Sequence, residues 1–117
     1  MKNRILIVVD YYSDTEMISK LLTAEFEVSL LSNVSKFLNT VSLVKPNLII
    51  LDRLSHANVY NVNNMLIKQN ILLDTPIIII SALPESSFNN IRYPERTVIT
   101  SFFDIDLVGD KILEITN

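Results

Sequence analysis

Residues 46–52 read PNLIILD, a short apolar run that ends in a carboxylate. All four residues of 48–51 are apolar, so the strand that they predict is buried on both faces. Two more runs have this character, ILIVV at 5–9 and IIII at 77–80. Continuous apolar runs, unlike alternating ones, are typical of parallel strands covered by helices above and below. The sequence therefore predicts three central parallel strands.

Weaker patterns add two outer strands and the helices between them. The alternating residues FEVSL at 26–30 predict an edge strand, and VIT at 98–100 predicts a fifth strand. Helical periodicity predicts helices at 13–22, 34–44, 59–70 and 85–91, and from residue 104 onward. Five strand–helix units imply right-handed crossovers and one parallel sheet between two layers of helices. We expect residues 1–117 to form a single α/β domain.

Composition excludes several classes of function. There is no cysteine, which removes disulfides and thiolate zinc sites, and the single histidine, His56, cannot form a multi-histidine site. The only glycine, Gly109, rules out a glycine-rich phosphate loop. A net charge of −3 without a basic cluster argues against nucleic-acid binding. No apolar run reaches the roughly 20 residues of a membrane helix and no signal peptide is visible, so we expect a cytoplasmic protein.

Polar residues stand where three of the predicted strands end. Asp10 follows the first strand, Asp52 the third and Ser81 the fourth. Parallel sheets bind ligands beyond the carboxyl ends of their strands, so we expect two carboxylates and a hydroxyl to lie close together there. Each residue alone is also a common turn or capping residue. The three together favour a functional site.

At these positions the whole chain resembles the receiver domain of bacterial response regulators. The resemblance is carried by the order and spacing of segments 4–10, 46–52, 75–82 and 101–107. It implies a three-layer α/β/α, flavodoxin-like (CheY-like) fold with a five-stranded parallel sheet of order 2-1-3-4-5. It also implies a signalling domain and not an enzyme. Such a domain accepts a phosphoryl group from a histidine kinase.

The resemblance also assigns roles to individual residues. Asp52 would be the phosphoacceptor, and the Ser81 hydroxyl would contact the phosphoryl group. Asp10, Asp52 and the backbone carbonyl of Leu54 would hold Mg²⁺. Oxygen ligands and neutralisation of a transferring phosphoryl group suit this ion.

Several working positions depart from the family pattern. Val9 replaces the first acidic residue, so we expect Mg²⁺ to bind weakly. Ser101 stands in place of a lysine, and losing one such donor costs on the order of 3 kcal/mol of transition-state stabilisation. Val98 replaces the aromatic residue that switches with phosphorylation. Arg53 is not expected to replace the lysine, because successive side chains of a strand point to opposite faces.

Three other positions bear on the predicted site. Leu54 and Leu83 occupy positions that tune hydrolysis of the aspartyl phosphate in the family. Neither side chain can orient a water molecule, so we expect any phosphate on Asp52 to be long-lived. His56 stands where the family usually has proline. We expect a solvent-facing loop residue there, with pH sensing or a phosphate contact as the alternative.

Three interpretations stay open at this point. The chain is a phosphorylatable but atypical receiver, or a pseudo-receiver that acts by protein–protein contact, or an unrelated flavodoxin-like binding module without phosphotransfer. The second includes a homodimer through the fourth helix, fifth strand and fifth helix, as in the family. A small-molecule enzyme would belong to the third class, but no nucleophile–base pair is visible. A C-terminal effector domain outside this sequence would carry any DNA binding.

Overall fold

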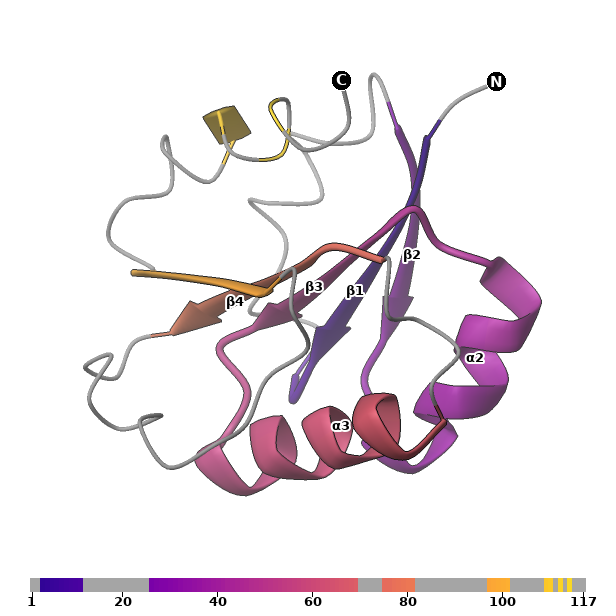
Figure 1. Cartoon of the computed structure of the whole chain (residues 1–117), viewed down its shortest axis with the longest axis vertical. Helices are drawn as coiled ribbons and strands as arrows, with labels where there is room; N and C mark the ends of the chain where they lie inside the picture. The colour runs from indigo at the N-terminus through magenta and orange to yellow at the C-terminus, as the bar shows by residue number, and fades with distance from the viewer. Residues whose placement is uncertain are drawn as a thin grey trace.

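A five-stranded, all-parallel sheet forms the centre of the molecule (Figure 1). The computed structural model describes residues 3–11, 26–69, 75–81 and 97–101, together with 109, 110, 112 and 114. The strands are β1 (Asn3–Val9), β2 (Phe26–Leu31), β3 (Leu48–Asp52), β4 (Ile77–Ser81) and β5 (Thr97–Ser101). Their order in the sheet is β2-β1-β3-β4-β5, which confirms the predicted topology.

Two of the expected helices are described in full. A 3-10 turn, η2 (Val34–Lys36), leads into α2 (Phe37–Val44), as predicted for 34–44. The next helix, α3 (His56–Gln69), begins three residues earlier than predicted. The Ser55 hydroxyl accepts a hydrogen bond from the Asn58 backbone N–H at 3.2 Å and so caps this start. His56 is thus an exposed residue of the first helical turn and not the loop residue that we expected.

The remaining helices are described in part or not at all. The predicted helices at 13–22 and 85–91 lie outside the described residues. In the last predicted helix, residues 109, 110, 112 and 114 are helical, and Ile112 is buried. Within the described part of the chain, no helix has both the length and the apolar character needed to cross a membrane.

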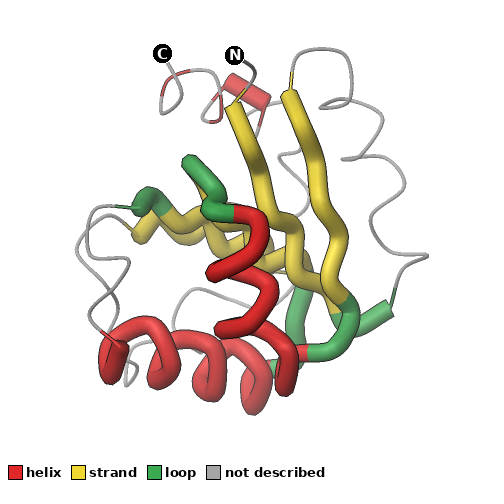
Figure 2. The backbone as a smooth tube through the Cα atoms, turned by 90° about the vertical axis from the view of Figure 1, so that its right-hand side faces the viewer, coloured by secondary structure: helices red, strands yellow, loops and turns green. Residues whose placement is uncertain are grey.

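The core has two halves, one on each face of the sheet. Alternate residues of β1, such as Leu6 and Val8, pack with residues of α2 and α3, and Figure 2 shows both helices on this side. The intervening residues, such as Ile5 and Ile7, pack on the other face together with Ile112. Each fully buried aliphatic side chain contributes about 1.5–3 kcal/mol. This two-sided burial explains why the segments 5–9, 48–51 and 77–80 of the central strands are apolar throughout.

Candidate functional site

The strand register brings the predicted site residues to one edge of the sheet. Val9 is aligned with Asp52, so Asp10 follows directly at the same edge. Asp52 is aligned with Ile80 on its other side, and Ser81 is aligned with Ser101. The carboxyl ends of β1, β3, β4 and β5 therefore carry the residues that the sequence indicated. The roles assigned to them stay predictions.

Asp52 is a buried carboxylate that is paired with its neighbour in the chain. Its side chain has 0% exposure, whereas that of Arg53 retains 21%. Arg53 Nε donates to Oδ1 at 3.1 Å and Nη2 donates to Oδ2 at 3.4 Å. A guanidinium that contacts both oxygens gives a charge-assisted, two-point pair. This pairing offsets part of the large cost of burying a carboxylate.

The expectation that Arg53 points away from Asp52 was wrong. The alternation of side chains holds within a strand, and β3 ends at Asp52. Arg53 has a φ of 51°, in the left-handed region, which redirects its side chain toward the carboxylate that precedes it. Its backbone N–H donates to the Ile80 carbonyl at 2.7 Å and fixes this conformation. Nothing in the sequence signalled it, because arginine is not a residue that favours left-handed backbone.

Asp10 accepts hydrogen bonds from the segment that follows β3. Its Oδ2 accepts the Ser55 backbone N–H at 2.8 Å, and its Oδ1 accepts the Asn58 side-chain amide at 2.7 Å. Asp10 therefore ties the end of β1 to the start of α3, where the helix dipole also favours a negative charge. Sequence reasoning missed Asn58, because its contact with Asp10 depends on where α3 begins.

These residues do not fit a Mg²⁺ ion in the conformation described. Both oxygens of Asp10 and both oxygens of Asp52 already accept N–H donors. Val9 is fully buried in the core, and among the described residues no three His, Cys, Asp or Glu side chains lie close enough to share a metal ion. The positive charge of Arg53 lies against both Asp52 oxygens and opposes a divalent cation there. Mg²⁺ on Asp10, Asp52 and the Leu54 carbonyl therefore stays a prediction.

Comparison with known proteins gives a match at the level of structure. No family model and no curated protein matches the sequence. A response-regulator receiver domain from Bermanella marisrubri is 20% identical with a TM-score of 0.79, and 100% of each chain is covered. The N-terminal domain of the nisin resistance regulator NsrR, a lantibiotic response regulator, is 23% identical with a TM-score of 0.75, again over 100% of each chain. The chain has a receiver-domain fold.

A third match was solved as a complex that contains a metal ion. The response regulator TrrA from Thermotoga maritima, in complex with Mg²⁺ and BeF, is 24% identical with a TM-score of 0.71, over 98% of this chain and 99% of that one. At such identities the likeness concerns the receiver fold alone. What the carboxyl edge of this chain does has to be argued from its own residues.

Other positions of the receiver fold differ in how far the structure describes them. Ser81 is buried with 6% exposure at the end of β4. Leu54 is also buried, and its side chain packs in the core half that contains α2 and α3. Val98 is half-buried in β5. Ser101 ends that strand as the Cα partner of Ser81, whereas Leu83 lies outside the described residues.

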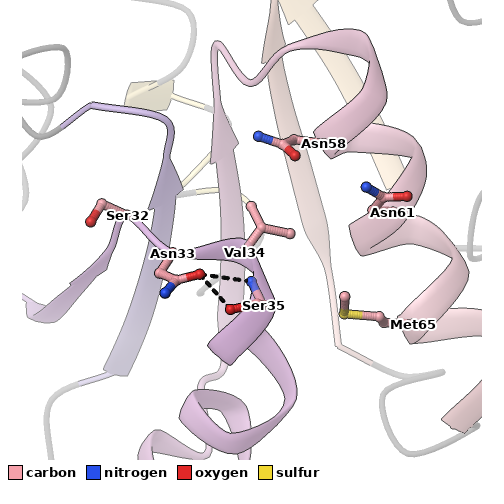
Figure 3. Close-up of a pocket in the computed structure, with 7 residues that line it drawn as sticks. All are labelled: Ser32, Asn33, Val34, Ser35, Asn58, Asn61 and Met65. Carbon is pink, nitrogen blue, oxygen red and sulfur yellow. Dashed lines mark hydrogen bonds between the residues drawn. The ribbon is translucent and has the colours of Figure 1, made fainter.

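A pocket of about 640 Å³ lies between the segment after β2 and α3 (Figure 3). Residues of both elements line it. Its lining is uncharged and consists of Ser32, Asn33, Val34, Ser35, Asn58, Asn61 and Met65. Asn33 Oδ1 accepts the Ser35 backbone N–H at 3.0 Å and the Ser35 hydroxyl at 2.6 Å. Asn58 connects this pocket to Asp10, a link that sequence reasoning did not predict.

Proposed function

We propose that this chain is a receiver-like domain of a two-component signalling system that acts mainly by protein–protein contact. In this proposal Asp52 is a poor or unused phosphoacceptor. One observation carries it: on a receiver-domain fold, the carboxylate at the acceptor position is buried and paired with the adjacent Arg53. A histidine kinase is the corresponding partner if transfer occurs at all.

The chemistry of transfer explains why this pairing matters. An oxygen of Asp52 must attack phosphorus while the bond from phosphorus to the donor nitrogen breaks and the leaving imidazole takes up a proton. The Arg53 guanidinium contacts both candidate oxygens and draws electron density from them. Val9 and Ser101 supply neither the extra carboxylate nor the extra cation that would offset this loss. Slow transfer follows.

Exposed aromatic side chains support action by contact. Tyr11 directly follows Asp10 and is 70% exposed, and Tyr60 on α3 is 50% exposed. Tyrosine is enriched at protein interfaces, where it buries an apolar ring and keeps a polar hydroxyl. The homodimer predicted through the fourth helix, fifth strand and fifth helix involves segments that lie largely outside the described residues.

Phosphorylation by a small-molecule donor tests the proposal. The protein is incubated with Mg²⁺ and acetyl phosphate, and intact mass spectrometry follows the addition of a phosphoryl group. We expect little labelling over hours, complete loss of any label in Asp52→Asn, and self-association or partner binding that this variant leaves unchanged. Stoichiometric labelling within minutes would show an efficient phosphoacceptor and contradict the proposal.

The pocket favours one alternative, a binding module without phosphotransfer. The pocket is a shallow hollow that is largely open to solvent, and its lining offers amide and hydroxyl groups for hydrogen bonding. Such a module would bind a small uncharged ligand in the pocket, and Asp52→Asn would leave binding unchanged. Asn61→Leu would weaken that binding, whereas protein partners that contact Tyr11 would be unaffected.

A further inference from the structure

We propose that Arg53 is a built-in counter-ion that takes the place of a divalent cation at the carboxyl edge and keeps metal ions off Asp52. The inference concerns the site of the proposed function and rests on it for the importance of Asp52. It goes beyond that function in explaining how the charge of Asp52 is compensated without a metal ion.

The first support is the geometry of the ion pair. Asp52 has no exposed side-chain surface, so its charge has to be compensated inside the protein. The guanidinium contacts Oδ1 at 3.1 Å and Oδ2 at 3.4 Å. A metal ion that used either oxygen would meet the positive charge of Arg53 at close range. The arginine therefore opposes metal binding at Asp52.

The second support is the backbone that holds Arg53 in place. A left-handed conformation is unfavourable for a residue with a Cβ atom. Arg53 adopts it at φ 51°, and its N–H reaches the Ile80 carbonyl at 2.7 Å. The hydrogen bonds to Asp52 offset the unfavourable backbone. Both the backbone conformation and the attraction between the charges therefore orient the Arg53 side chain toward the carboxylate.

The third support is that Asp10 does not depend on the same cation. Its two oxygens accept the Ser55 N–H and the Asn58 amide, at 2.8 and 2.7 Å. Each carboxylate of the edge therefore has its own donors within the chain. A metal ion shared between Asp10 and Asp52 would meet neutral N–H donors at Asp10 but a cation at Asp52, so the guanidinium is the main obstacle.

Binding of Mn²⁺, followed by the electron paramagnetic resonance signal of the free ion, tests this inference. Arg53→Asn removes the charge but keeps a residue that tolerates left-handed backbone. Arg4→Asn is the matched control: it changes the net charge equally, but it lies in the first half of β1 and donates to the Lys45 carbonyl instead. We expect Arg53→Asn to bind Mn²⁺ on the order of tenfold more tightly than the wild type, the effect of one lost charge pair. Arg4→Asn should match the wild type.

Two further variants make the result decisive. Adding Asp52→Asn to Arg53→Asn should abolish the gain, because the freed carboxylate is the ligand. Circular dichroism shows whether Arg53→Asn folds, and if it does not, Arg53→Lys replaces it. Arg53→Lys keeps the charge but loses the two-point contact. It should therefore bind Mn²⁺ more tightly than the wild type, but by a smaller factor than Arg53→Asn. Equal Mn²⁺ affinity in the wild type and the folded Arg53 variant would overturn the inference.

The outcome is independent of the phosphorylation test. If Arg53→Asn gains Mn²⁺ affinity but acetyl phosphate still does not label it, the role of Arg53 as counter-ion is supported and Asp52 is no phosphoacceptor. If the wild type is labelled within minutes, the proposed function fails, and the Mn²⁺ comparison still decides the role of Arg53.

Discussion

The interior of the sheet and its carboxyl edge are built in different ways. Within β1, β3 and β4, residues such as Ile7, Ile50 and Ile78 are fully buried and pack together in one apolar cluster on one face of the sheet. At the edge, Asp10 and Asp52 are held by specific N–H donors. The interior depends on how much apolar surface is buried, which many sequences provide. The edge depends on which donor each carboxylate finds, which one or two residues decide.

The largest effect is expected in the interior. Ile50→Ala should lower the free energy of unfolding by about 2–5 kcal/mol, because it leaves a cavity in the central strand. Urea denaturation followed by circular dichroism measures this change. Leu43→Ala is the matched control, since Leu43 is 85% exposed and its truncation should stay within about 0.5 kcal/mol. Equal losses in the two variants would show that the sheet interior is not the core.

A smaller but still large effect is expected from the ion pair at the edge. Arg53→Asn should lower the free energy of unfolding by about 1–3 kcal/mol, since it leaves a buried carboxylate without its cation. Asp52→Asn combined with Arg53→Asn should be less destabilised than the sum of the single variants, because both remove one interaction. Additive losses in this double-mutant cycle would mean that the two side chains do not interact in solution.

The smallest of the three effects is expected at Asp10. Asp10→Ala removes the acceptor of the Ser55 N–H and of the Asn58 amide, and should cost about 1–2 kcal/mol. Hydrogen exchange of the Ser55 amide should become faster, because that N–H loses its partner. Asn58→Ala, which leaves the Ser55 contact in place, serves as the control. If Asp10→Ala leaves the exchange rate of the Ser55 amide unchanged, Asp10 does not hold the start of α3 in solution.

The sequence predicted the interior better than the edge. Apolar runs such as 48–51 indicated buried parallel strands because burial on both faces leaves a direct trace in residue type. The same logic placed Asp10, Asp52 and Ser81 at one edge, since the carboxyl ends of parallel strands share an edge. It could not predict the partner of Asp52, because that partner depends on a single backbone angle at Arg53. Asn58 was missed for a similar reason, as its contact depends on the start of α3.

The Arg53 Nε–H group offers the most direct test of the account. In a ¹H–¹⁵N spectrum of the wild type at neutral pH, its signal should be resolved and exchange slowly with solvent, because the proton is held on Asp52. In Asp52→Asn the signal should move and exchange much faster. An Arg53 Nε–H that exchanges equally fast in both proteins would show that the arginine does not hold the carboxylate, and the assignment of Arg53 as its counter-ion would fail.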